Sequence, residues 1–208
     1  MKQIIARSTL FTILCLSTAF SQEEKGRLGL GVSLNPTALF SGSTTSTVFL
    51  PVGLTDIYLT LDNGKGFRLE PEFGIYSTSS ESSTGAPYAS SSSSSASLIR
   101  IGTGVFGMFL RDSSFNAYAG PRVGVLLTSQ TSQSGTSPET TTSESDIYVG
   151  FSLGGEYYLS PHFSLGGEVQ LNYIKFGEPK RDPASTTLST STRSMYTNNA
   201  VMFFRWYY

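Results

Sequence analysis

The amino-acid sequence predicts an all-β fold, an eight-stranded antiparallel up-and-down transmembrane β-barrel. Apolar and polar residues alternate with a period of two in eight segments, which is the pattern of strands with one apolar and one polar face. Tight turns alternate with long Ser/Thr-rich connections between these segments. Every arginine inside a segment falls on the polar face, together with glycine and glutamate. These observations favour a barrel whose polar face lines the lumen.

The composition suits one membrane domain. The chain has 208 residues, of which 14% are charged and 12% are aromatic. The aromatic content argues against general disorder, and the length is enough for a single domain. The formal net charge is -1 and no basic block occurs, so we expect no nucleic-acid partner.

Residues 1–21 have the features of a secretory signal peptide. Lys2 and Arg7 precede an apolar run that ends at Leu16, and small residues follow up to Ser21. The apolar run is too short for a stable spanning helix. We therefore expect a cleaved signal peptide over residues 1–21 and an outer-membrane β-barrel domain over residues 22–208.

Cys15 is the single cysteine of the chain, and it leaves with the signal peptide. A lipoprotein signal at Cys15 is disfavoured, because Leu14 before it is larger than the small residue usual at that position. Loss of Lys2 and Arg7 changes the formal charge from -1 to -3. The mature domain is then expected to have no disulfide and no thiol chemistry, and any membrane crossing must use strands.

The first three strands follow from the alternation and one strong turn signal. The first strand is expected at Arg27–Leu34, and a short loop near Ser41–Ser46 follows it. The second strand runs to Asp62, and a change of parity upstream predicts a bulge near Thr55 or a later start. The sequence Asp-Asn-Gly-Lys-Gly at residues 62–66 is a hairpin turn, and the third strand begins after it.

The fourth and fifth strands are expected between two Ser-rich loops. The first loop covers about Ser77–Ser97, and strand four spans Leu98–Phe109. A tight turn at Arg111–Ser114 leads into strand five at Phe115–Thr128. The second long loop then covers about Ser129–Ser145.

The last three strands complete the pattern. Strand six is expected at about Ile147–Tyr157, with a turn at Ser160–His162 and strand seven from Phe163 to Tyr173. A fourth connection covers about Gly177–Ser194, and strand eight ends the chain, with alternation visible over Ala200–Tyr208. Tight turns and both termini then lie on one side, as in barrels with short periplasmic turns and longer external loops.

Two prolines lie inside predicted strands. Pro71 and Pro121 lack the N–H group that a strand interior contributes to the ladder. We expect a bulge or an irregular hydrogen bond at each.

A soluble barrel of the lipocalin type would show the same alternation with its apolar face inside. Three features favour the membrane barrel: strand interiors carry no lysine, aromatic residues gather at strand ends, and the chain ends on an aromatic residue. The aromatic residues at strand ends are Phe67, Phe109, Tyr157, Phe163 and Trp206 on the tight-turn side and Phe40 and Tyr173 on the other side.

The mid-strand charges fit the lumen. An arginine on the lipid face near the bilayer midplane costs roughly 2–4 kcal/mol, against a typical domain stability of about 5–15 kcal/mol. The arginines and carboxylates of the polar face nearly balance, so we expect a paired network inside the barrel. Its members are Arg27, Asp56, Arg68, Glu70, Glu72, Arg100, Arg122, Glu156, Glu168 and Arg205.

The chain resembles the small eight-stranded outer-membrane proteins, the group that includes OmpX, the OmpA barrel and OmpW. The likeness rests on the segments Tyr118–Val125 and Leu153–Glu168 and on the final strand. It implies localisation in the outer membrane of a Gram-negative bacterium, contact with outer-membrane lipid and lipopolysaccharide, and a monomer. It also implies that the barrel-assembly machinery reads the C-terminal strand as an insertion signal, here through Phe204, Trp206 and Tyr208.

Residues with catalytic potential are few. His162 and Ser164 have a His-x-Ser spacing that resembles lipid A deacylases, which are eight-stranded barrel enzymes with a Ser-His-Glu site. We favour a turn role for His162, because Ser164 has lumen parity and no glutamate lies at a matching distance. Glu70 and Glu72 lie beside Arg68 and indicate a salt-bridge cluster rather than an acid and base pair. We expect no enzyme activity, no catalytic residue, no metal and no cofactor.

The leading hypothesis is a non-enzymatic outer-membrane barrel with a structural or surface-interaction role, carried by Ser/Thr-rich extracellular loops. One alternative is a narrow porin-like channel for small solutes, with low conductance because eight strands leave an interior just wide enough for side chains. Another is a lipid A-modifying barrel enzyme, which the missing lipid-facing polar set disfavours. The sequence indicates no particular extracellular partner.

Overall fold

The computed structural model describes residues 26–34, 56–84, 90–135, 137–183 and 193–208. Several predictions made above lie outside these residues. They are the signal peptide at residues 1–21, the alternatives at Cys15, the loop at Ser41–Ser46, the parity change near Thr55 and the aromatic Phe40. Among the described residues, no helix is long and apolar enough to cross a membrane.

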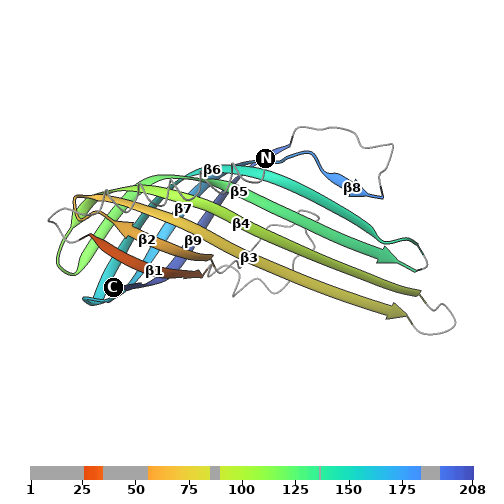
Figure 1. The fold of residues 1–208 in the computed structure, drawn as a ribbon, viewed down its shortest axis with the longest axis horizontal. Helices are drawn as coiled ribbons and strands as arrows, with labels where there is room; N and C mark the ends of the chain where they lie inside the picture. The colour runs from red at the N-terminus through yellow and green to blue at the C-terminus, as the bar shows by residue number, and fades with distance from the viewer. Residues whose placement is uncertain (1–25, 35–55, 85–89, 136, 184–192) are drawn as a thin grey trace, which may run out of the picture.

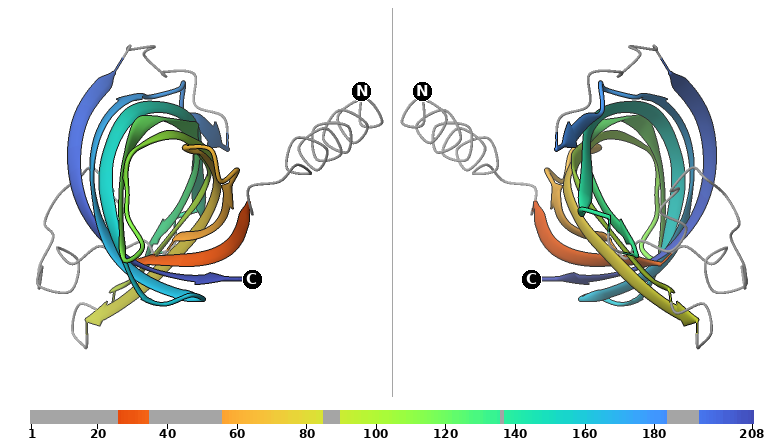
Figure 2. Two further views of the ribbon diagram at one scale, coloured as in Figure 1. Left: turned by 90° about the vertical axis from the view of Figure 1, so that its left-hand side faces the viewer. Right: turned by 90° about the vertical axis from the view of Figure 1, so that its right-hand side faces the viewer.

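The described part of the chain forms a closed ring of eight antiparallel strands and one short additional strand (Figures 1 and 2). The strands are β1 (Arg27–Leu34), β2 (Asp56–Asp62), β3 (Phe67–Thr84), β4 (Ser90–Arg111), β5 (Phe115–Ser134), β6 (Thr140–Ser160), β7 (Phe163–Lys175), β8 (Lys180–Asp182) and β9 (Ser194–Tyr207). Each strand of the ring pairs with its neighbours in sequence, and β9 closes the ring on β1. The predicted fold class is confirmed.

The three predicted tight turns lie at one end of the barrel, beside the C-terminus (Figure 1). In the first turn, Asn63 Oδ1 accepts hydrogen bonds from the amides of Lys65 and Phe67, at 2.8 and 3.0 Å. Gly64 and Gly66 adopt φ angles of 76° and 94°, which non-glycine residues rarely take. The sequence therefore contains both the side-chain acceptor and the glycines that this hairpin requires.

The prediction of long loops at residues 77–97 and 129–145 is largely wrong, because most of these residues belong to paired strands. β3 and β4 stay paired from Phe67–Gly107 to Thr84–Ser90, and β5 and β6 stay paired as far as Ser132–Thr140. Both hairpins project beyond the other strands (Figure 1). Their side chains are mostly Ser, Thr and Gln on both faces, because water lies on either side. Apolar alternation therefore ends before the strands do, while the backbone ladder continues.

A short strand also lies inside the connection predicted at residues 177–194. β8 pairs with β6 through Lys180–Ser143, Arg181–Thr142 and Asp182–Thr141. β7 occupies the same edge of β6 only as far as Ile147, so β8 takes over the edge that β7 leaves free.

Pro71 and Pro121 interrupt one ladder each without shifting the register. Between β2 and β3, pairing lapses from Tyr58–Glu72 to Leu61–Leu69. Between β4 and β5, it lapses from Gly104–Arg122 to Gly107–Ala119. The expected irregular bonding is confirmed at both prolines and no bulge occurs at either, since each proline lacks an N–H on only one edge.

The outer face of the barrel is apolar. Twenty-eight large hydrophobic side chains in the described residues are exposed, so burial by protein cannot explain their placement and lipid contact does. Aromatic residues lie at both ends of this face. Phe163 packs against Phe204 and Trp206 near the tight turns, with ring centroids 6.3 and 6.1 Å apart, and Tyr173 packs against Tyr196 near the other end, at 5.1 Å.

Interior glycines make room for interior rings. A Cβ atom added at Gly31 would lie 2.2 Å from Tyr58, and one at Gly154 would lie 2.5 Å from Tyr118. A Cβ at Gly166 would similarly lie 2.2 Å from Phe203. Each ring therefore occupies the space that a side chain on the neighbouring strand would fill, and glycine leaves that space free.

We expect Gly31→Val to destabilise the barrel by about 1–3 kcal/mol, because Tyr58 is buried and cannot yield space without disturbing its neighbours. The midpoint of urea unfolding in lipid vesicles, followed by the heat-modifiable gel mobility of the folded barrel, measures this loss. Gly107→Val is the matched control, since a Cβ there would meet nothing nearer than 3.9 Å. Equal midpoints for the two variants would contradict the argument.

Candidate functional site: the lumen network and the projecting hairpins

Three arginines from different strands meet inside the barrel. Arg68 of β3, Arg122 of β5 and Arg205 of β9 are 0%, 5% and 1% exposed. Alternation along each strand directs them inward, because their sequence neighbours on both sides face lipid. Isolated charges with so little water contact would be strongly destabilising, so each requires carboxylate partners.

Arg122 contacts three carboxylates at once. Its Nη1 atom donates to Glu72 at 2.6 Å, and its Nε and Nη2 atoms donate to the two oxygens of Glu168 at 3.0 Å each. Nη2 also reaches Glu70 at 3.3 Å, and Nε donates to Ser152 at 3.0 Å. The bidentate contact with Glu168 is the geometry in which guanidinium and carboxylate bind most strongly.

Arg205 and Arg68 extend the network towards the tight-turn end. Arg205 donates to Glu70 at 2.6 Å and to Glu156 at 2.7 Å. Arg68 donates to Glu156 and lies 3.4 Å from Asp62. Glu70 thus pairs with all three arginines and Glu156 with two of them, which makes the network continuous across the lumen.

A second level lies closer to the projecting hairpins. Arg100 donates to Asp56 at 2.9 Å, and its guanidinium lies 5.3 Å from the ring centroid of Tyr148. The Tyr148 hydroxyl donates in turn to Glu72. This ring therefore connects the Asp56–Arg100 pair to the central network.

The structure brings nine of the ten residues predicted for the lumen into ion pairs with one another. Arg27 is the exception: it is exposed, forms no ion pair with a described carboxylate, and lies 5.0 Å from the ring centroid of Tyr158. Asp62 joins the network although it was predicted as the end of the second strand and the start of the turn, and not as a lumen charge. Its inward parity with Asp56 and Tyr58 is the sequence signal that could have placed it.

The sequence predicted a polar interior, but the interior also contains apolar side chains. Tyr58, Phe106, Tyr118 and Phe203 form a buried aromatic cluster among the guanidinium groups, and Arg205 lies 3.9 Å from the ring centroid of Phe203. Four more buried side chains form an apolar cluster across the lumen, closer to the projecting hairpins than the aromatic cluster is. They are Leu98, Leu126, Tyr148 and Ile174. All of them occupy inward positions, where alternation alone predicts polar residues.

Side chains fill most of the lumen. The free space among Asp56, Glu72, Arg122, Gln170 and Arg205 amounts to about 10 Å³ for the centre of a water molecule. That is room for about one water. Paired side chains therefore occupy most of the lumen at this level.

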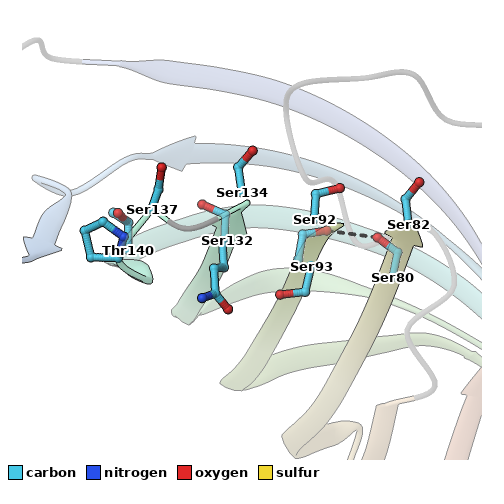
Figure 3. Close-up of a pocket in the computed structure, with 11 residues that line it drawn as sticks. Ser80, Ser82, Ser92, Ser93, Ser132, Ser134, Ser137 and Thr140 are labelled. Carbon is cyan, nitrogen blue, oxygen red and sulfur yellow. Dashed lines mark hydrogen bonds between the residues drawn. The ribbon is translucent and has the colours of Figure 1, made fainter. Parts of the chain in front are cut away.

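The projecting hairpins form a polar sheet with a hollow of about 360 Å³ on one face (Figure 3). Hydroxyl groups of β3, β4 and β5 point into it, and Ser80 and Ser94 share a hydrogen bond of 2.9 Å. No charged or aromatic side chain lines this hollow. It offers hydrogen-bond donors and acceptors but no group that titrates near neutral pH.

His162 and Ser164 do not form a lipid-facing site. Ser164 is fully buried and donates to Glu156 at 3.2 Å, so its hydroxyl belongs to the lumen network. The Nδ1 atom of His162 lies 3.1 Å from the Tyr207 carbonyl oxygen, next to the turn. Among the described residues, no group of three or more His, Cys, Asp or Glu side chains has a metal-binding arrangement.

The proposed insertion residues face outward. Phe204, Trp206 and Tyr208 are 39%, 52% and 74% exposed, on the lipid side of β9 and at the chain end. Alternate positions Arg205 and Tyr207 point into the lumen. The end of the last strand thus presents aromatic side chains outward and Arg205 and Tyr207 inward.

Residues 8–198 match the family model described as the outer membrane protein beta-barrel domain. The match covers most of the chain, and the ring of eight strands agrees with it. The chain therefore belongs to this family of outer-membrane β-barrel proteins, and its location is the outer membrane. The boundary between signal peptide and barrel near residue 22 stays a prediction.

Two solved structures are similar to this chain. A major outer membrane protein from Thermus thermophilus aligns with 88% of this chain and 99% of its own, with 9% identity and a TM-score of 0.50. Neisserial surface protein A (NspA) aligns with 87% of this chain and 94% of its own, with 16% identity and a TM-score of 0.44. A search of curated proteins found no match. The first likeness bears on the fold alone.

We expect Arg122→Met to destabilise the barrel by about 3–5 kcal/mol, because Glu70, Glu72 and Glu168 would lose a shared buried counter-charge. Arg193→Met is the control: its pair with Glu144 at 2.7 Å is half exposed, so the loss should stay below about 1 kcal/mol.

Urea unfolding in vesicles measures both losses, and adding Glu72→Gln and Glu168→Gln to the Arg122 variant should restore part of the stability. Similar losses for the Arg122 and Arg193 variants would contradict a buried network.

Proposed function

We propose that this protein is a non-enzymatic outer-membrane barrel with a closed lumen, which holds two long polar hairpins outside the cell for structural or surface-interaction roles. The observation that carries the proposal is the contrast between the two ends of the molecule. The tight turns and the chain end lie together, while β3–β4 and β5–β6 extend from the opposite end (Figure 1). Outer-membrane barrels place short turns in the periplasm and long connections outside.

The hairpins are long enough to clear the membrane surface. Beyond Ile75 and Ile147, the last exposed apolar residues of β3 and β6 at this end, both strands carry only polar side chains and Tyr76 on the way to the tip. From Ser77 to Thr84 the strand adds about 25 Å at roughly 3.3 Å per residue. The polar ends of the hairpins contact neither lipid nor the lumen network. Their length and regular pairing support a role as a surface that contacts other molecules.

The filled lumen disfavours the channel alternative. A conducting pore would need a continuous path past both the charged network and the apolar cluster of Leu98, Leu126, Tyr148 and Ile174. The space at the network level holds about one water molecule. The inward position of Ser164 likewise disfavours a lipid A-modifying enzyme, which would present its nucleophile to lipid.

The partners that follow from this proposal are those of outer-membrane barrels in general. Lipid of the outer membrane, including lipopolysaccharide, would contact the apolar outer face. The assembly machinery would recognise the alternating last strand through Phe204, Trp206 and Tyr208, which are accessible from outside the barrel. No cofactor is needed, and a monomer satisfies the ring without a second chain.

We expect the purified folded protein to show no steady single-channel steps in planar lipid bilayers, because its lumen is filled by paired side chains. Arg100→Gln and Glu72→Gln test the alternative directly, since both residues line the lumen. Steady currents in the wild type that change in amplitude or ion selectivity in these variants would establish a channel and overturn the closed-lumen proposal.

The orientation has its own test. A short peptide tag inserted after Gly135, where an added Cβ atom would meet nothing within 4 Å, should be labelled by antibody on intact cells. The same tag inserted after Asn63, in the tight turn, should be labelled only after the outer membrane is permeabilised. The reverse pattern would place the hairpins in the periplasm and exclude a surface role.

A further inference from the structure

The lysines and arginines at the hairpin end of the barrel are confined to one side. Every basic residue after residue 25 belongs to the described part of the chain. Seven of these eleven lie in the lumen or near the tight turns, and the other four belong to the region of β7, β8 and the start of β9. These four are Lys175, Lys180, Arg181 and Arg193. Between the lumen residues Arg100 and Arg122 and the hairpin tips, β3, β4 and β5 carry no basic residue.

Two of the four point away from the lumen. Lys175 pairs with Ile147, which is exposed on the lipid-facing side of β6, and directly paired residues share a face. Lys180 pairs with Ser143, which has the same parity on β6 as Ile147. The two lysines therefore lie on the outer face, separated by four residues of β6, or about 13 Å at roughly 3.3 Å per residue.

An aromatic pair marks the height of these lysines relative to the bilayer. Tyr173 precedes Lys175 by one step on the same face of β7 and packs against Tyr196, with ring centroids 5.1 Å apart. Tyrosine is enriched at the headgroup level of membranes. Lys175 lies about 7 Å beyond Tyr173 along the strand and level with Ile147, where the apolar outer face ends, and Lys180 lies farther along the sheet.

The charges of Lys175 and Lys180 are not used within the protein. Neither forms an ion pair with a described carboxylate, whereas Arg193 is paired with Glu144 at 2.7 Å and lies over the ring of Phe176. Two exposed carboxylates, Glu178 and Asp182, lie in the same connection and also form no ion pair with a described basic residue. Asp182 pairs with Thr141, beyond Lys180, whereas Glu178 lies between the two lysines in the chain and leaves both without an ion-pair partner in the described part of the protein.

We propose that Lys175 and Lys180, together with the Tyr173–Tyr196 pair below them, bind the phosphate groups of a phosphorylated glycolipid in the outer leaflet. Each amine supplies three hydrogen-bond donors and a full positive charge, and the tyrosine rings contact the adjoining lipid. A basic pair at this level adds attraction for anionic headgroups to the general contact of the apolar belt. The inference rests on the orientation proposed above, which the tag insertions test separately.

The test measures binding of diphosphoryl lipid A to the detergent-purified full chain by native mass spectrometry. The double variant Lys175→Gln, Lys180→Gln should bind it roughly thirtyfold more weakly, since a lysine near a lipid surface contributes about a fivefold change. Lys175→Arg with Lys180→Arg should retain binding, because the charge is kept. Lys65→Gln, in the tight turn at the other end, is the matched control and should bind as the wild type does.

Two further arms identify the ligand. Dephosphorylated lipid A should bind wild type and double variant equally, and inorganic phosphate should not displace diphosphoryl lipid A at the same concentration. Equal binding of diphosphoryl lipid A by wild type and double variant overturns the proposal. Displacement by equimolar inorganic phosphate overturns the assignment to a lipid. The glutamine variants remove exposed charges only and the arginine variant keeps them, and the heat-modifiable gel shift confirms that each is folded.

Discussion

Hydrocarbon offers the peptide backbone no water, so each amide and carbonyl at membrane depth must bond to a neighbouring strand. The ring meets this requirement because β9 returns to pair with β1, from Gly29–Tyr207 to Leu34–Met202. Closure also creates an enclosed inside, where inward residues from every strand come together. The buried charges depend on it, since an open sheet would leave the same guanidinium groups facing lipid.

Inside the ring, charge and aromatic surface are interleaved. Arg122 is shared by three carboxylates, and Arg205 lies between Glu70, Glu156 and the ring of Phe203. Rings lie against the guanidinium groups while carboxylates accept their hydrogen bonds, although the Nε atoms of Arg68 and Arg205 have no hydrogen-bond partner among the described residues. This arrangement makes the lumen a packed core, and the projecting hairpins extend beyond it.

Alternation and turn chemistry were enough to predict the ring, the bounds of β1, the three tight turns and the inward side of Arg68, Arg122 and Arg205. They failed where a different physical rule decides. The hairpin ends carry Ser and Thr on both faces, so the pattern disappears although the ladder continues. Tyr118 and Phe203 lie on the polar face because inward rings fill space between charges, and a two-class pattern of polar and apolar residues cannot represent that.

The fit of rings over glycines has an evolutionary consequence. A lineage can replace Gly31 only after the ring at Tyr58 has become smaller, and the same dependence joins Gly154 to Tyr118. Interior positions must therefore change as couples, through intermediates of reduced fitness. The serine-rich hairpins carry no such dependence, so drift can alter them one residue at a time. Sequence change is therefore expected to be slower at these glycine-and-ring couples of the wall than in the polar hairpins.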